Sequence, residues 1–170
     1  MAGRSRLPWP ARLSGDGLEG AAAPRAAGWR SGGGTATLRR VRVLLSNDDG
    51  VHAAGIRALS EAFEGDEIWI VAPDREQSAS SHAISLHRPL RMQELGPRTF
   101  AVDGTPTDAV YMGLNHVLRG RRPDVVVSGV NHGPNLANDV LYSGTVAAAM
   151  EGALLGVNAV AVSLASPPPH

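Results

Sequence analysis

The sequence predicts an α/β fold, in which a mostly parallel, Rossmann-like sheet forms the middle of three layers. Short runs rich in Val, Ile and Leu alternate with segments whose apolar residues recur at helical spacing. Clusters of oxygen-bearing side chains follow these apolar runs directly, at the end of the strand where parallel sheets place their binding sites. A chain of 170 residues has the length of one such domain.

The first expected elements are a strand, a helix and a second strand. Val41–Leu45 and Ile68–Ala72 are continuous apolar runs of strand length, and Pro73 closes the second run. Between them, four apolar residues at helical spacing predict a short amphipathic helix. These residues are Ile56, Leu59, Ala62 and Phe63.

The second half predicts two further helices and three strands. Thr99–Val102 reads as a short strand, and Pro106 suits the first turn of a helix that runs to Leu118. The remaining elements are a strand at Asp124–Ser128, a helix rich in small residues at Gly144–Leu155 and a strand at Asn158–Ser163.

Three regions are expected along the chain. Residues 1–38 consist mainly of Gly, Ala, Pro, Ser and Arg without periodicity, which predicts a disordered leader or upstream sequence from a misassigned start. A transit peptide is the weaker alternative. Residues 39–166 form the expected core and residues 167–170 a tail. The fold is expected to be truncated after Asn158–Ser163, because doubly wound sheets usually continue, and this last strand would then expose an apolar edge.

Composition excludes several classes of function. Residues 1–40 hold seven arginines against two acidic residues, whereas residues 41–170 hold nine against fourteen. The acidic body argues against a nucleic-acid duplex as partner. No apolar run approaches the roughly 18 residues of a membrane span, so no membrane partner is expected. The chain has no cysteine, which excludes thiolate chemistry and is compatible with the cytoplasmic location that we expect.

Four polar segments are the candidates for a site, and each follows an apolar run that reads as a strand. Because the carboxyl ends of parallel strands face one crevice, residues far apart in sequence can meet there. The segments are Ser46–Gly50, Asp74–Ser78, Ser128–Asn131 and Tyr142–Thr145.

The adjacent carboxylates Asp48 and Asp49 repel each other unless a cation lies between them, which makes a metal site one interpretation. The alternative is an ordinary Asn/Asp/Gly turn. Ser78 offers a neutral oxygen ligand, or belongs to a capping cluster for a helix at Ser80–Ile84. Asn131 offers a carbonyl oxygen to Mg²⁺ or Ca²⁺, or stabilises a turn.

Ser143, Gly144 and Thr145 open a predicted helix, whose free N–H groups attract anions. A simple N-cap is the alternative, and the two interpretations are compatible. Asn135 is a candidate substrate contact, and His132 is a weaker candidate for a proton shuttle. The other histidines, including His82, read as surface or packing residues. The chain lacks the motifs G-x-S-x-G, Walker A and G-x-G-x-x-G.

Taken together, the motifs resemble the SurE family of metal-dependent 5′/3′-nucleotidases. The matching stretches are Val43–His52, Val71–Ser78, Gly104–Asp108 and Val127–Gly152. The resemblance implies a metal-dependent, acid-phosphatase-like hydrolase that converts nucleoside 5′- and 3′-monophosphates to nucleoside and phosphate.

The resemblance also implies the residues of the site. It implies one divalent ion, Mg²⁺ or Mn²⁺ with Ca²⁺ a further candidate, and assigns Asp48 and Asp49 a catalytic role. The implied metal ligands are Asp48, Asp49, Ser78 and Asn131, and the implied phosphate- and substrate-binding residues are Asn135, Ser143, Gly144 and Thr145.

The sequence departs from the family in places, with Ala54, Ala79 and Asn138 where many relatives have Pro, Gly and an acid. Relatives also continue for about a hundred residues beyond Ser163, into a region that holds the subunit interface of a homo-oligomer. Two hypotheses therefore remain open: an active nucleotidase, and a truncated, non-catalytic metal- or nucleotide-binding fragment of the same fold.

Overall fold

A computed structural model describes residues 40–77 and 80–165. The expected leader and tail lie outside the described residues, and so does Ser78. The strands are β1 (Arg42–Ser46), β2 (Glu67–Pro73), β3 (Met92–Gly96), β4 (Thr99–Val102), β5 (Val125–Asn131) and β6 (Asn158–Ser163). The α-helices are α1 (Ala54–Ala62), α2 (Pro106–Met112) and α3 (Gly144–Leu154), with a π-helical turn η1 (Gly113–Val117) and a 3₁₀ helix η2 (Ala137–Leu141).

The six strands form one sheet in the order β3-β4-β2-β1-β5-β6. Only the β3–β4 pair is antiparallel, so the mostly parallel sheet that the sequence predicts is confirmed. From β1 the chain first builds β2 and β4 on one side, then crosses to β5 and β6 on the other. The carboxyl ends of β1 and β5 therefore flank the point where the strand order reverses, which is where open α/β sheets bind ligands.

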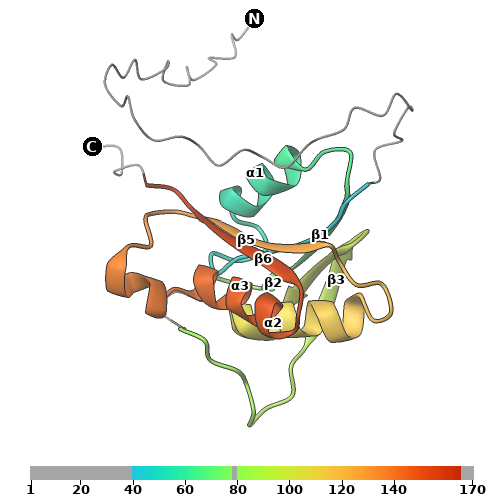
Figure 1. Cartoon of the computed structure of the whole chain (residues 1–170). Coiled ribbons are helices and arrows are strands. Elements are labelled where there is room, and N and C mark those ends of the chain that lie inside the picture. Colours follow the sequence, from blue (N-terminus) through green and yellow to red (C-terminus); the bar gives the residue numbers. More distant parts are fainter. Residues whose placement is uncertain (1–39, 78–79, 166–170) are drawn as a thin grey trace, which may run out of the picture. The chain divides into compact units, whose positions relative to one another are not determined.

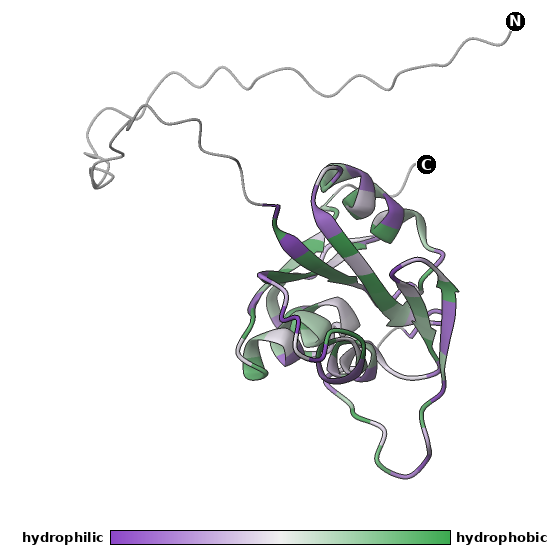
Figure 2. Ribbon diagram, turned by 90° about the vertical axis from the view of Figure 1, so that its right-hand side faces the viewer, coloured by the Kyte–Doolittle hydropathy of each residue, from purple (hydrophilic) through white to green (hydrophobic). Residues whose placement is uncertain are grey.

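Helices cover both faces of this sheet, which confirms the three layers (Figures 1 and 2). Alternate residues of β1 point to opposite faces, as a strand requires. Val43 and Leu45 pack in the cluster that contains Ile56 of α1, whereas Leu44 packs in the cluster beneath α2 and α3. Because β1 buries both of its faces, it reads in the sequence as a continuous apolar run.

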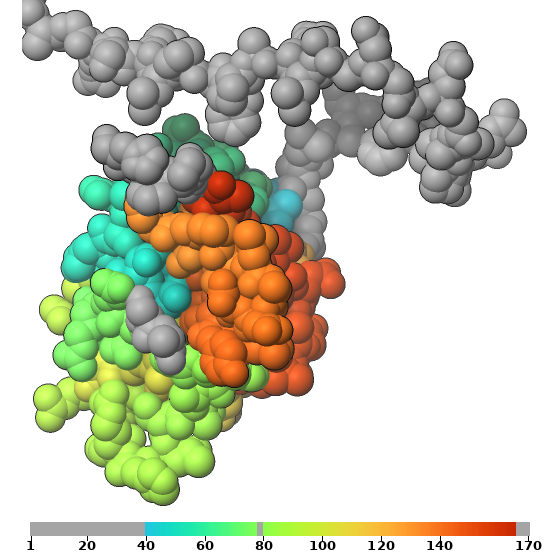
Figure 3. All heavy atoms as spheres, turned by 90° about the vertical axis from the view of Figure 1, so that its left-hand side faces the viewer, coloured from blue at the N-terminus to red at the C-terminus, as the bar shows by residue number. Residues whose placement is uncertain are grey.

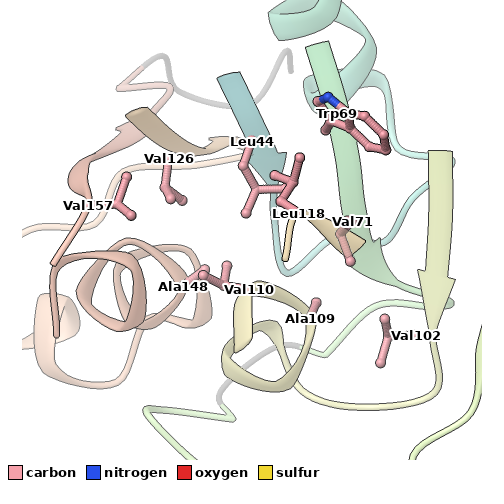
Figure 4. Packing of buried hydrophobic residues seen from close by; sticks show 10 residues of the cluster. All are labelled: Leu44, Trp69, Val71, Val102, Ala109, Val110, Leu118, Val126, Ala148 and Val157. Atoms are coloured by element: carbon pink, nitrogen blue, oxygen red, sulfur yellow. The ribbon is translucent and has the colours of Figure 1, made fainter. Parts of the chain in front are cut away.

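The helices α2 and α3 lie side by side against the second face (Figure 4). Val110 of α2 and Ala148 of α3 meet between the two helices, and both side chains are fully buried. Gly152 brings α3 close to the sheet, because a Cβ at this position would lie 2.9 Å from Cγ2 of Val126. Small residues such as Gly152 thus allow α3 to pack closely on β5.

Several details differ from the prediction. Strand β5 extends to Asn131, so this residue ends a strand instead of lying in a loop. The residues from Ser80 to Ile84 form a turn at Ser81 and His82 and no helix. The Tyr142–Thr145 segment follows η2, not a strand. The antiparallel strand β3 was not predicted, because its sequence MQELG has no apolar run that would set it apart from a loop.

Strand β6 forms one edge of the described sheet. Its Val160 side chain is 50% exposed. Among the described residues, no helix is both long and apolar enough to cross a membrane.

Candidate functional site

The loop after β1 is held by its own asparagine. Asn47 Nδ2 donates to the Gly50 carbonyl at 2.9 Å, and the Gly50 N–H donates to Asn47 Oδ1 at 3.2 Å. Gly50 has a φ of +98°, which glycine adopts without strain. The Asn/Asp/Gly turn is therefore present, and it is built by Asn47 and Gly50. The carboxylates of Asp48 and Asp49 take no part in these two bonds.

Asp48 is almost fully buried against the start of α3. The buried Thr145 hydroxyl donates to Asp48 Oδ1, which joins two residues that lie 97 positions apart in the sequence. Gly144 is in contact with the same side chain, since a Cβ added to it would lie 2.7 Å from Cβ of Asp48. Ser143 caps the helix by accepting a hydrogen bond from the Val146 N–H at 3.2 Å. The helix start and the first carboxylate thus form one packed unit.

A cleft of about 490 Å³ opens at the carboxyl ends of β1 and β5, and we call it the carboxylate cleft. Its lining residues are Asp48, Asp49, Glu76, Asn131, His132, Asn135, Asp139, Tyr142 and Ser143. Figure 3 shows the segments after β1 (cyan) and β5 (orange) side by side on this face. Six candidate residues from the sequence line this cleft, namely Asp48, Asp49, Asn131, His132, Asn135 and Ser143.

The other predicted residues lie differently. Gly144 and Thr145 contact Asp48 without being among the lining residues, and Ser78 is outside the described residues. Sequence reasoning did not single out Glu76, Asp139 or Tyr142 as site residues, although the first and last lie within the polar segments that it named. Glu76 lies in the loop after β2, Asp139 lies in η2 and Tyr142 directly follows η2. The conformations of this loop and of η2 were not predicted.

Negative charge dominates the carboxylate cleft. Burial raises the pKa of Asp49 above its usual value, and the nearby carboxylates of Asp48 and Glu76 raise this pKa further. The backbone N–H of His132 opposes this shift by donating a hydrogen bond to Asp49. Four carboxylates line the cleft, and His132 is the only basic side chain among the lining residues that the structure describes. A cation in the cleft would relieve this repulsion.

The donors suit a hard divalent cation. Asn131 donates through Nδ2 to the Gly133 carbonyl at 2.9 Å, which leaves its side-chain oxygen as an acceptor. Asp48 and Asp49 add carboxylate oxygens, the ligands that Mg²⁺ and Mn²⁺ prefer. In the described part of the chain, no three His, Asp or Glu side chains form a metal-binding group. The residues therefore fit an ion that binds two carboxylates and an amide and keeps several waters.

Two more polar contacts shape the surroundings. Asn135 donates through Nδ2 to the hydroxyl of Ser163 at 2.7 Å, so the end of β6 fixes its orientation. His82 was expected to be a surface or packing residue. Its Nε2 lies 2.9 Å from the buried Glu151 carboxylate, and this pair joins the loop after β2 to α3.

Comparison with known proteins points to one family. A family model described as "Survival protein SurE" matches residues 43–169. The chain is 87% identical over 130 residues to "5′-nucleotidase SurE" of Anaeromyxobacter dehalogenans (strain 2CP-C), covering 76% of this chain and 51% of that protein. It is 64% identical over 124 residues to the protein of the same name from Myxococcus xanthus (strain DK1622), covering 72% and 47%.

The solved structures agree with this result. The crystal structure of the SurE protein from Aquifex aeolicus superposes with a TM-score of 0.72 at 43% sequence identity. The alignment covers 75% of this chain and 52% of that one. The chain thus spans about half the length of the relatives that it matches.

Proposed function

The chain belongs to the Survival protein SurE family, and on that premise we propose that it is a metal-dependent phosphomonoesterase. In this proposal it hydrolyses nucleoside 5′- and 3′-monophosphates to nucleoside and phosphate. The observation that carries the proposal is the junction of Asp48 with the start of α3, where Thr145 and Gly144 contact the carboxylate. This junction supports the proposal, because a carboxylate that could hold a cation lies against a helix start that could bind an anion.

Charge supports a metal-dependent reaction. A phosphate monoester is an anion, and the carboxylate cleft would repel it through Asp48, Asp49, Glu76 and Asp139. A divalent cation held by two of these carboxylates reverses the sign of the interaction locally. The elevated pKa of Asp49 has burial as its first cause and Asp48 as its second, so a cation bound at these carboxylates would favour its ionised form.

Each residue has a defined part in this proposal. Asp48, Asp49 and Asn131, together with Ser78, would hold the ion, which when bound polarises a phosphoryl oxygen and lowers the pKa of a coordinated water. Thr145 fixes one oxygen of Asp48, and the His132 N–H fixes Asp49. The N-terminal end of α3, an eleven-residue helix, offers its dipole to the phosphoryl oxygens, with the Ser143 hydroxyl beside it.

The alternative is a non-catalytic protein of the same fold that binds a metal ion or a nucleotide. It is favoured by one observation: the chain spans only about half the length of its relatives. The two functions differ in turnover and not in binding, so one set of measurements separates them.

The test is phosphate release from AMP and from a generic monophosphate ester by the full chain, with Mn²⁺, Mg²⁺ or EDTA. We expect turnover that requires the metal and that Asp49→Asn reduces at least about 100-fold, because a neutral amide cannot replace a ligating carboxylate. Glu61→Gln, on the exposed face of α1, is the matched control and should retain the rate. If Mn²⁺ binds in calorimetry without turnover, the non-catalytic function is correct. If Mn²⁺ does not bind at all, the metal site is wrong.

A further inference from the structure

A second cavity, of about 460 Å³, borders the carboxylate cleft, and we call it the alanine cavity. Its lining residues are Asp49, Ala53, Ala54, Gly55, Ala58, Val130, Asn131, His132 and Leu164. Three of them, namely Asp49, Asn131 and His132, line the carboxylate cleft as well. The two hollows therefore meet along a common border.

The walls of the alanine cavity come from the start of α1, the end of β5 and the residue that follows β6. Gly55 presses the first turn of α1 onto β5, because a Cβ at this position would lie 2.1 Å from the carbonyl oxygen of Val130. On the other side, the Leu164 N–H donates to the Asn131 carbonyl at 3.0 Å. The exposed side chains of Ala54 and Ala58 complete the wall formed by α1.

The two hollows contrast in chemistry. Outside the shared border, every residue that lines the alanine cavity is Ala, Gly, Val or Leu. Small-molecule pockets typically enclose roughly 300–1,000 Å³, are mostly apolar and hold a few polar groups that orient the ligand. Here the polar groups stand at one end only, where the phosphate would bind under the proposed function.

We propose that the alanine cavity binds the base of the nucleoside portion of the substrate. This inference rests on the proposed function, which places the phosphate in the carboxylate cleft. A flat, neutral aromatic ring would pack against Ala58, Val130 and Leu164, which transfers its surface out of water. The shared border residues Asn131 and His132 lie where the ring meets the polar end.

A third cavity is the principal competitor. It measures about 520 Å³ and is lined in part by Asp74 and Arg75, which directly follow β2. We call it the arginine cavity. Its lining residues are Asp74, Arg75, Arg88, Arg91, Met92, Gln93, Ala101 and Asp103. Five of these eight side chains carry charge, an environment that suits an anion and offers a neutral ring little apolar surface.

The test is binding of adenosine, which carries no phosphate, to the metal-free full chain, followed by two-dimensional ¹H–¹⁵N NMR. We expect the amide signals of Ala54, Ala58, Val130 and Leu164 to shift. Ala58→Phe fills the cavity from an exposed position and should weaken binding at least about tenfold. Ala62→Phe adds the same ring to an exposed residue of the same helix that does not line the cavity, so it should bind adenosine as the unaltered chain does.

Leu164→Ser provides a second variant, which removes the opposite wall without adding bulk and should also weaken binding. The inference is overturned if millimolar adenosine does not bind, if both alanine variants bind it equally, or if the shifts gather instead around Arg91 and Met92. Shifts at Leu141 and Tyr142 alone would overturn it too, because they would place the ring against η2 instead of α1.

Turnover separates this inference from the proposed function. Ala58→Phe should lower kcat/KM for AMP about tenfold relative to glycerol phosphate, which has no aromatic ring. If Ala58→Phe weakens adenosine binding but neither ester is hydrolysed with a metal ion, the proposed function is wrong and the base site is retained. If both esters are hydrolysed in a metal-dependent reaction and Ala58→Phe leaves the ratio of their kcat/KM values unchanged, the base site is wrong and the proposed function is retained.

Discussion

Replacing Gly144 by alanine tests the contact between α3 and Asp48. The added methyl group would lie 2.7 Å from Cβ and 2.9 Å from Oδ2 of Asp48. Carbon atoms in contact normally lie about 3.5–4.0 Å apart, so the overlap is about 1 Å. Rotation of the Asp48 side chain does not relieve it, because Cβ is fixed by the backbone. Either the start of α3 or the loop after β1 must move.

Two opposing effects set the magnitude. Alanine is about 1 kcal/mol more favourable than glycine within a helix. Overpacking a well-packed site typically costs about 1–3 kcal/mol. We therefore expect Gly144→Ala to lower the free energy of unfolding by up to about 2 kcal/mol, which corresponds to a fall in Tm of up to about 8 °C. The same movement should weaken Mn²⁺ binding.

Differential scanning calorimetry with and without Mn²⁺ measures both effects. Gly96→Ala is the matched control, because it adds the same methyl group where no atom lies within 4 Å. A Gly144→Ala variant with a Tm raised by about 4 °C, the value of helix propensity alone, and with unchanged Mn²⁺ binding would refute the reasoning.

Three further predictions concern single contacts. Thr145→Val should destabilise the fold by about 1–3 kcal/mol in denaturant titration, because it leaves an oxygen of the buried Asp48 without its donor, whereas Thr145→Ser should restore most of this loss. A hydrogen bond from Arg42, and to a smaller extent one from Trp69, lowers the pKa of Glu67 from 4.5 to about 2. The contribution of Glu67 to stability is therefore complete above pH 4.5 and is lost as the pH falls toward 2. Glu67→Gln should therefore show a flatter fall of Tm over that interval, and an unchanged slope would contradict the assignment. Leu44→Ala should cost about 2–5 kcal/mol of stability, since this side chain is fully buried, and a smaller loss in chemical denaturation would indicate that the cavity collapses.

The sequence predicted the elements that carry a clear apolar pattern and missed those that do not. Strand β6 spans the predicted residues Asn158–Ser163, and Pro106 opens α2 as expected. Strand β3 escaped prediction because it lies at the edge of the sheet and is only partly covered, so its residues carry no period that sets it apart from a loop. The extension of β5 to Asn131 escaped for a related reason, since Gly129 and Asn131 are typical of turns.

The candidate site divides in the same way. Asp48, Asp49, Asn131, Asn135 and Ser143 were predicted because each follows or begins an element that can be read from the sequence. The contact between Thr145 and Asp48 could not be predicted, because it depends on how closely α3 packs on β5. The alanine cavity was equally hidden, since residues such as Ala54 and Ala58 carry no chemical signature of their own.

The hydrogen bond between Thr145 and Asp48 joins residues that lie 97 positions apart. It therefore determines when during folding the molecule can bind a metal ion at the proposed site. Contacts this distant in sequence form late, because loop closure must be completed before they are made. During synthesis, β1, β2 and β4 can pair before α3 has emerged, yet the aspartate then lacks the helix that holds it. A metal ion that needs this arrangement would bind only the finished sheet, and would therefore stabilise the native state without rewarding any partly folded one.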